Sequence, residues 1–176
     1  NNAERRVVIV GGGVIGAACA YYLAKRNWQV TIIEQGEFGM ACSHANCGYL
    51  SPSHVLPLAM PGAVRKAMKM MWKPNSPIYV RPRFDLRLLG WLWNFSRRCN
   101  EHDMLTGGAA RHALLQSSRQ LYDELIRTES LACEYQSVGC LFPYQDKNTF
   151  NHFAKENDLT REHFGVAADR IDGEAL

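Results

Sequence analysis

The sequence has no long hydrophobic run, no internal repeat and no paired cysteine spacing. None of its 176 residues falls in an apolar stretch near the roughly 18 residues needed to span a bilayer. No secretory leader is visible ahead of the first expected strand, so a cytoplasmic location is expected. The six cysteines form no C-x-x-C pair, and Cys42, His44 and Cys47 fall short of four ligands. The sequence therefore predicts neither a metal site nor a disulfide framework.

Acidic residues are scarce in one part of the chain. Residues 61–100 hold nine Lys and Arg and a single acid, Asp85, although the whole chain has a net charge of only +3. Three of the four tryptophans, Trp72, Trp91 and Trp93, lie among these cations. Two interpretations stay open: a surface that lies on an anionic membrane, or buried apolar faces with solvated cations. Nucleic-acid binding is not predicted, because no recognised nucleic-acid motif accompanies the charge.

A glycine-rich turn follows the first apolar strand that we expect, at residues 7–10. Its G-x-G-x-x-G pattern leads directly into an amphipathic helix. Gly11 allows the tight turn, Gly13 lets a pyrophosphate approach the backbone, and Gly16 lets the helix pack closely on the sheet. The first helical turn then offers free N–H groups and a positive dipole end to the phosphates.

The second expected strand, residues 30–34, ends in an acid, Glu34. Its carboxylate is placed to accept hydrogen bonds from the ribose hydroxyls of an adenosine, and it disfavours the 2′-phosphate of NADP. Asn27 stands where the helix should end, and asparagine tolerates the left-handed conformation of a helix terminus. Strand, glycines, helix and acid together predict an α/β fold that starts with a dinucleotide-binding βαβ unit. A glycine-rich turn in an ordinary α/β protein is the plainer alternative.

Beyond this unit the periodicity of apolar residues predicts mostly helices. The expected elements are a helical turn at 43–48, helices at 61–73, 85–98, 107–128 and 147–163, strands at 134–144 and 166–171, and a connector marked by Pro74, Pro77 and Pro82. Two parallel strands alone do not make a stable doubly wound sheet. We therefore expect later residues, or a partner chain, to complete the sheet, with this chain as the amino-terminal portion of a longer protein.

The segment after Glu34 resembles a known family. Met40-Ala41-Cys42-Ser43-His44-Ala45-Asn46-Cys47-Gly48, followed by Leu50-Ser51-Pro52, is similar to the S-x-x-N-x-G stretch of FAD-dependent D-amino acid dehydrogenases, relatives of the glycine and D-amino acid oxidases. Also similar are Pro57, the Met60-Pro61-Gly62 turn, residues 66–68 and 78–82, the helix ending in Arg97-Arg98, and Gly139-Cys140-Leu141. The resemblance covers nearly the whole chain. It implies FAD binding by residues 1–57, a helical segment at 58–130 and the start of a mixed α+β substrate domain at 131–176.

The glycine turn and the resemblance together give the expected cofactor contacts. These are Gly11, Gly12, Gly13, Val14, Ile15, Gly16, Glu34, Gln35, Cys42, Ser43, Asn46 and Gly48. The resemblance implies that Ser43, Asn46 and Gly48 line the pyrophosphate and the flavin, and an N-cap role for Ser43 stays open. No catalytic residue is assigned, because the groups that hold substrate are expected downstream. His44, His54 and Tyr49 lie near the cofactor segment, but a loop histidine more often has a hydrogen-bonding or surface role.

The resemblance implies oxidation of a D-amino acid to its imino acid by hydride transfer to the flavin. It also implies electron transfer to a quinone or another acceptor, which would suit peripheral attachment to the inner face of the plasma membrane. Three alternatives stay open at this point. The protein could be an oxidase of glycine- or sarcosine-type amines that uses dioxygen, an NAD-dependent enzyme, or a dinucleotide-binding module without turnover.

Overall fold

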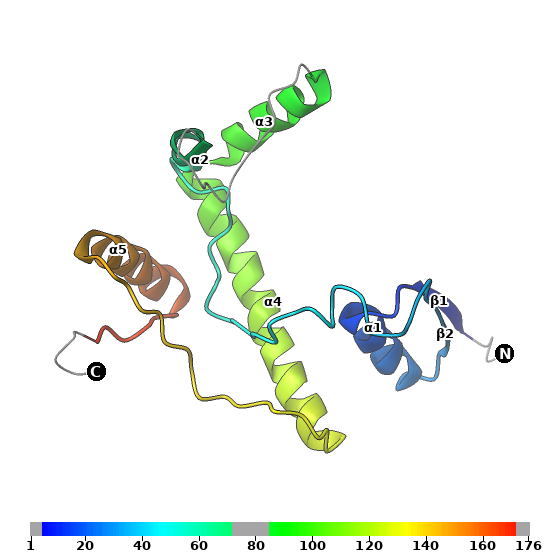
Figure 1. Ribbon diagram of the computed structural model, residues 1–176. Coiled ribbons are helices and arrows are strands. Elements are labelled where there is room, and N and C mark those ends of the chain that lie inside the picture. Colours follow the sequence, from blue (N-terminus) through cyan, green and yellow to red (C-terminus); the bar gives the residue numbers. More distant parts are fainter. Residues whose placement is uncertain (1–4, 72–84, 172–176) are drawn as a thin grey trace. The chain divides into compact units, whose positions relative to one another are not determined.

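A computed structural model describes residues 5–71 and 85–171 of the chain (Figure 1). Its elements are β1 Arg6–Val10, α1 Val14–Ala24, β2 Gln29–Ile33, α2 Ala63–Met71, α3 Leu86–Arg98, α4 Glu101–Thr128 and α5 Lys147–Phe164. The chain folds as two compact units, Asn1–Leu50 and Ser51–Leu176. Trp72, Lys73 and the predicted connector with its three prolines lie outside the described residues. The domain boundaries expected at residues 57 and 130 stay predictions.

The first unit is a βαβ unit, as the sequence predicts. β1 and β2 are parallel, with Val7 opposite Val30 and Val10 opposite Ile33. α1 is the crossover between them and contacts both strands. The Gly11 N–H donates to the Ile33 carbonyl at 2.8 Å, so the ladder extends into the glycine turn. The acid Glu34 therefore follows directly at the carboxyl end of β2, beside the turn that follows β1.

The carboxyl end of α1 confirms the expected role of Asn27. This residue has a φ of 60°, in the left-handed region. Its N–H donates to the Ala24 carbonyl at 2.9 Å, and the Trp28 N–H donates to the Leu23 carbonyl at 3.1 Å. This pair of bonds is the Schellman arrangement, in which the left-handed residue turns the chain back while the last carbonyls keep their donors.

α1 packs so closely on the glycine turn that no space remains for a side chain at Gly16. A Cβ placed there would collide with the Gly11 carbonyl and lie 3.4 Å from the Ile9 side chain. The Gly11 carbonyl belongs to the backbone, so it cannot swing aside as a flexible side chain would. Gly11 itself has a φ of 105°, which L side chains rarely adopt. Both predicted glycine roles are confirmed.

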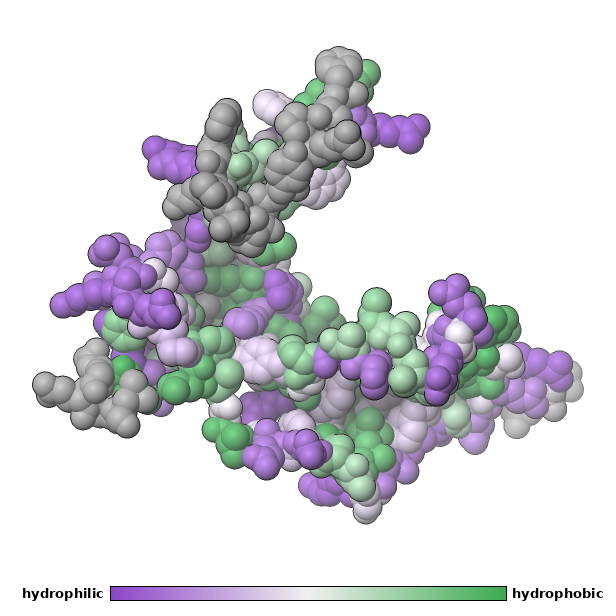
Figure 2. Space-filling view, viewed as in Figure 1, coloured by the Kyte–Doolittle hydropathy of each residue, from purple (hydrophilic) through white to green (hydrophobic). Residues whose placement is uncertain are grey.

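The two strands leave much of their apolar surface uncovered. Among the described residues they are the whole sheet. Val8, Val10 and Ile33 are exposed, with Val10 at 84%. Figure 2 shows apolar residues, in green, on the surface of the molecule. Parallel sheets are normally covered on both faces, so this unit presents apolar surface for further structure.

Three helices of the second unit, α3, α4 and α5, begin at side-chain caps. Asp85 accepts from the N–H groups of Arg87 at 3.0 Å and Leu88 at 3.2 Å, which confirms it as the N-cap of α3. Asp146 accepts from the Thr149 N–H at 2.8 Å and from its hydroxyl at 2.6 Å at the start of α5. α5 ends at Gly165, whose φ of 65° closes the helix. These helix boundaries follow the sequence closely.

α4 begins at Glu101 and not near residue 107, so that predicted start is wrong. Asn100 caps the helix by accepting from the Asp103 N–H at 2.9 Å. Gly107 and Gly108 therefore both lie inside the helix. Gly108 is buried, and a Cβ there would lie 2.6 Å from the Phe164 ring of α5. Close approach of an aromatic ring therefore explains why glycine occurs within a helix here.

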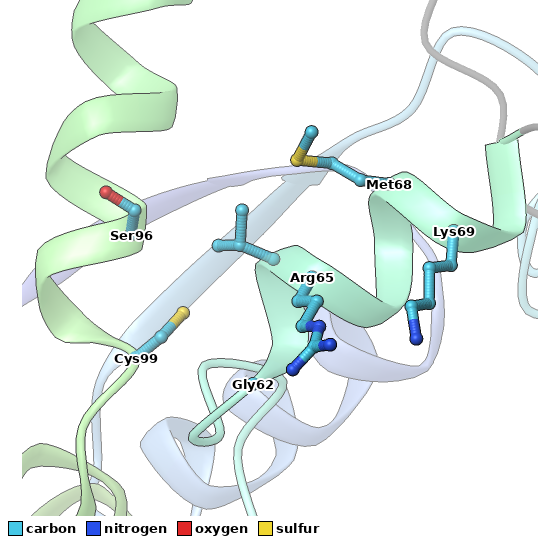
Figure 3. A pocket seen from close by; sticks show the side chains of 7 residues that line it. Gly62, Arg65, Met68, Lys69, Ser96 and Cys99 are labelled. Atoms are coloured by element: carbon cyan, nitrogen blue, oxygen red, sulfur yellow. The ribbon is translucent and has the colours of Figure 1, made fainter.

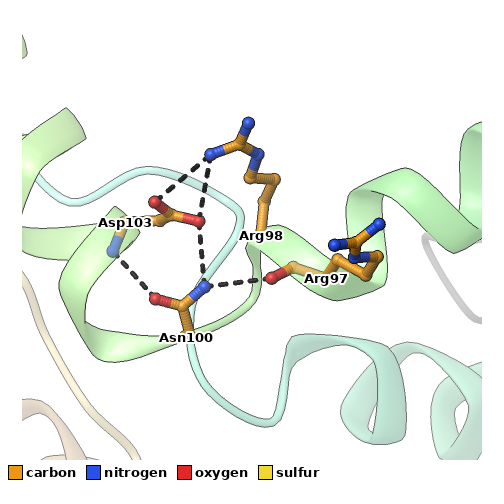
Figure 4. A network of polar contacts seen from close by, with 4 residues as sticks. All are labelled: Arg97, Arg98, Asn100 and Asp103. Atoms are coloured by element: carbon orange, nitrogen blue, oxygen red, sulfur yellow. Dashed lines mark hydrogen bonds and ion pairs between the residues drawn. The ribbon is translucent and has the colours of Figure 1, made fainter.

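A polar network joins the end of α3 to the start of α4 (Figure 4). The Asn100 amide donates to the Arg97 carbonyl at 3.0 Å and to the Asp103 carboxylate at 2.9 Å. Arg98 lies 3.4 Å from the same carboxylate. The Asn100 hydrogen bond, with help from the nearby Arg98 charge, lowers the pKa of Asp103. The short link between the two helices is thus fixed on both sides.

Three predicted local elements are wrong. Residues 134–144 and 166–171 form no strand, and residues 43–48 form no helical turn, since turns occupy residues 38–45. A strand needs a neighbour with which to exchange backbone hydrogen bonds, and no described strand is paired with either segment. The backbone of Ala168 is bonded instead to the buried Asn157 side chain, whose amide donates at 2.9 Å and accepts at 2.7 Å.

Replacing Gly16 by Ala should destabilise the protein by about 2–3 kcal/mol, because the added methyl group overpacks a contact with backbone. Gly90→Ala is the matched control. Gly90 lies within α3 and a Cβ there meets nothing within 4 Å, so the change should stabilise by about 0.5–1 kcal/mol. Urea unfolding of the full chain measures both. Equal effects of the two changes would contradict the close packing of α1 on the turn.

Candidate dinucleotide-binding site

The Glu34 carboxylate lies on the glycine turn and is held by three backbone donors. Its Oε2 accepts from the Gly12 N–H at 2.6 Å. Its Oε1 accepts from the N–H groups of Gln35 at 2.8 Å and Gly36 at 3.2 Å. These bonds, that of Gly12 first, lower the pKa of Glu34. The acid is therefore ionised and fixed in direction, with lone pairs left over for a hydroxyl donor such as a ribose.

Ser43 lies at the amino end of α1, although it is 29 residues from Val14 in sequence. Its Oγ accepts from the Val14 N–H at 2.9 Å. Gly13, the N-cap position of α1, has no side chain to do this, so Ser43 caps the helix from a distance. The hydroxyl hydrogen remains for a second partner, because a serine can accept and donate at once. The N-cap role that the sequence left open for Ser43 is thus found at α1, and not at the turn that follows Ser43.

Gly12 and Gly13 keep the turn bare beside these two side chains. A Cβ on Gly13 would lie 2.8 Å from the Ser43 hydroxyl oxygen. A Cβ on Gly12 would lie 2.6 Å from the Phe38 ring and 3.2 Å from the Glu34 carboxylate. Helix geometry leaves the N–H groups of Ile15 and Gly16 without an intrahelical acceptor. Bare backbone, free N–H groups and a hydroxyl donor suit a diphosphate, and the carboxylate suits the sugar next to it.

The structure brings only some of the predicted residues together. Gln35 joins the cluster through its backbone N–H. Asn46 and Gly48 form a separate local bend, in which the Asn46 Oδ1 accepts from the Gly48 N–H at 2.7 Å and Gly48 has a φ of 67°. Cys42 is an exposed free thiol. The part of the chain that the structure describes contains no group of three His, Cys, Asp or Glu side chains able to hold a metal ion.

Phe38 is the residue of this site that the sequence analysis missed. Its ring lies against Gly12, and the Gly39 N–H donates to the Gly12 carbonyl at 3.0 Å. The only hint in the sequence is an aromatic residue within a glycine-rich loop, four positions after Glu34. Such a residue more often packs into a core, so nothing local predicted that it would return to the glycine turn.

These features define a βαβ unit of the kind that binds the ADP part of a dinucleotide. The sequence model of the family described as "FAD dependent oxidoreductase" matches residues 6–176. The chain therefore belongs to this family, and the cofactor of the family is FAD. The Glu34 carboxylate and the bare turn fit the ADP half of that cofactor. The resemblance seen in the sequence is confirmed.

Curated relatives carry a more specific name. The chain is 33% identical to proteins named D-amino acid dehydrogenase from Methylobacterium nodulans and Phenylobacterium zucineum, over 95% of this chain. It covers 40% and 39% of those proteins. A protein of the same name from Xanthobacter autotrophicus is 33% identical over 90% of this chain. The chain thus spans about two fifths of the length of these relatives. No solved structure matches it.

Acid should weaken the contact between Glu34 and the turn. The folded-state pKa of Glu34 is lowered, so the contact stabilises the protein above the unfolded pKa and this stabilisation is lost as pH falls through the folded value. Glu34→Gln should therefore flatten the fall of the unfolding free energy below about pH 4.5, the ordinary pKa of a glutamate. Glu37→Gln, three residues along, serves as the control. Parallel pH profiles for wild type and Glu34→Gln would contradict the contact.

Proposed function

We propose that the protein oxidises amino acids, D-amino acids in particular, in an FAD-dependent dehydrogenase reaction. The observation that carries this proposal is the Glu34 carboxylate fixed on the glycine turn by the Gly12 N–H. The family membership supports the cofactor, and the names of the relatives support the substrate class. A carboxylate in this position favours an unphosphorylated ribose, as in FAD, over the 2′-phosphate of NADP.

In the proposed holoenzyme each residue of the site has one task. Glu34 accepts hydrogen bonds from the hydroxyls of the adenosine ribose. Ser43 keeps its bond from the Val14 N–H and donates its hydroxyl hydrogen to a phosphate oxygen. The N–H groups of Ile15 and Gly16 add two donors at the positive end of α1. Bound FAD supplies the redox chemistry, because its flavin can accept the hydride that leaves the α-carbon of the amino acid.

Three further residues are proposed to lie along the cofactor beyond the diphosphate. The bend at Asn46 and Gly48 exposes polar backbone, and Gly48 lies in the left-handed region that favours glycine. Cys42 directly precedes Ser43, which binds the end of α1. Their place in one short loop with Ser43 supports this assignment. Catalytic groups are not assigned to this chain.

Ser43→Ala should weaken FAD binding by about tenfold, since a hydrogen bond to a charged group contributes about 1.5 kcal/mol. Ser53→Ala is the matched control: Ser53 is an exposed loop serine whose hydroxyl lies 3.3 Å from that of Ser51. The measurement is the quenching of flavin fluorescence when FAD is added to the apoprotein of the full chain. Equal affinities in wild type and Ser43→Ala would remove Ser43 from the site.

The reaction itself is tested with the full protein as purified. A panel of D- and L-amino acids is added without oxygen, and bleaching of the flavin absorbance by D-amino acids is expected. No bleaching by any amino acid would favour a binding module without turnover. Absence of flavin absorbance would favour an NAD-dependent enzyme. Peroxide formed in air with glycine or sarcosine would favour the oxidase.

We also propose that electrons leave for a quinone at an anionic membrane, and that α3 lies on that membrane. Trp91 and Trp93 on α3 are 59% and 66% exposed, which leaves this apolar face available to a membrane surface. The helix ends in Arg97 and Arg98. Exposed tryptophan beside cations is typical of helices that lie in the headgroup layer. No helix among the described residues is apolar and long enough to cross a bilayer.

A cavity beside α3 adds to this surface (Figure 3). It has a volume of about 580 Å³ and is lined by Gly62, Val64, Arg65, Met68, Lys69, Ser96 and Cys99. Arg65 and Lys69 lie on α2, so two further cations face the same region as the end of α3. Each cation near an anionic surface contributes about 1 kcal/mol to attachment. Charge complementarity therefore favours an anionic membrane over a neutral one.

The full chain should sediment with phosphatidylglycerol vesicles at low salt and much less with phosphatidylcholine vesicles. High salt should release it, because screening weakens the attraction. Replacing both Trp91 and Trp93 by Ala should weaken sedimentation about tenfold or more. Leu114→Ala and Leu121→Ala on α4, both exposed apolar side chains, are the control. Failure to sediment with anionic vesicles at low salt would overturn the membrane proposal without touching the proposed reaction.

A further inference from the structure

Phe38 has no task in the proposed function, although it lies in the same site. Its ring edge is so close to Gly12 that a Cβ there would lie 2.6 Å from Cδ2 and 3.0 Å from Cε2. The Glu34 Oε2 would lie 3.2 Å from the same Cβ built on Gly12. An aromatic ring and the acid that would hold the ribose thus border the same glycine.

The position of the ring is fixed by the backbone that carries it. The Gly39 N–H donates to the Gly12 carbonyl at 3.0 Å, directly after Phe38. The Met40 N–H donates to the Glu37 carbonyl at 3.2 Å, which closes a tight turn around the aromatic residue. Gly39 has a φ of 78°, so this turn requires glycine. The loop therefore returns to the glycine turn with Phe38 at the contact.

Phe38 is only partly covered beside the glycine turn. The residue is 56% exposed even though one edge of its ring lies on Gly12. An aromatic residue that only filled space would be buried, and this one is not. An exposed aromatic face beside polar groups that fix orientation is typical of the wall of a small-molecule site.

The side of the glycine turn on which Phe38 lies indicates which part of a bound dinucleotide the ring would contact. Ser43 marks the diphosphate, because it lies at Gly13 and at the start of α1. Glu34 marks the ribose, and it borders Gly12 together with Phe38. Phe38 is therefore on the adenosine side of the diphosphate. The base is the flat, aromatic part of an adenosine, and bases stack on aromatic side chains.

We propose that Phe38 is a specificity-determining residue whose free ring face packs against the adenosine of the bound dinucleotide. This inference rests on the proposed function, since it needs an adenine dinucleotide at the glycine turn. It adds that recognition of the base comes from this loop, in addition to recognition of the sugar by Glu34 and of the diphosphate by the helix. A purely structural role would be to hold the loop on Gly12.

The test compares two probes with the apoprotein of the full chain: ADP, and D-ribose 5-diphosphate, which has the same sugar and diphosphate but no base. Titration calorimetry gives both affinities for wild type, Phe38→Leu, Phe38→Trp and the control Leu114→Ala. Phe38→Leu should weaken ADP about tenfold, from loss of base stacking, and leave the ribose diphosphate unchanged. Phe38→Trp should keep the affinity for ADP, and Leu114→Ala should change neither probe.

Other outcomes separate the two proposals. Equal weakening of both probes by Phe38→Leu, or no weakening of either, would overturn the contact with adenosine while the dinucleotide site stands. A wild-type protein that binds neither ADP nor FAD would overturn the proposed function and this inference with it. If Phe38→Leu fails to fold, Phe38→Trp and Phe38→Tyr decide the question, because loss of ADP binding by both aromatic variants would contradict stacking.

Discussion

The approach of the Glu34 carboxylate to the Gly12 N–H is the interaction on which the rest of the site depends. It requires that the strand before the acid and the strand before the glycines be parallel and in register, so that their carboxyl ends meet. It also requires a turn without side chains, because a Cβ on Gly12 would lie against the carboxylate. Register, crossover helix and glycine pattern are thus all requirements of one close contact between backbone and acid.

This contact was predictable from the sequence because each of its requirements is local. A β-branched strand, glycines at fixed offsets and an acid at the end of the next strand can all be read within residues 7–34. Asn27 and the cap at Asp85 were predictable for the same reason, since a cap concerns a few neighbouring residues. Where contacts between residues close in the sequence determine the structure, the sequence was sufficient to predict it.

The wrong predictions concern segments whose structure depends on residues that are distant in the sequence. Residues 134–144 alternate like a strand, but alternation predicts only a face and not the neighbour that would complete the ladder. The helix predicted from residue 107 begins at Glu101, and Gly108 inside it makes room for the distant Phe164 ring. Ser43 and Phe38 both return to the glycine turn from a loop whose path no periodic pattern specifies. The approach of Phe38 to the turn was therefore not predictable from the sequence, and Ser43 was predicted only through the resemblance to a family.

The same distinction bears on which parts of the site define the cofactor. In the proposed function, Glu34 and the glycines recognise features that every adenine dinucleotide shares, a ribose and a diphosphate. On the returning loop, Phe38, Gly39 and Ser43 contact the turn from outside the βαβ unit. A loop that is bonded to the turn at Gly12 and Val14 cannot move without disturbing the diphosphate site. The path of the loop is for this reason coupled to the geometry of the turn.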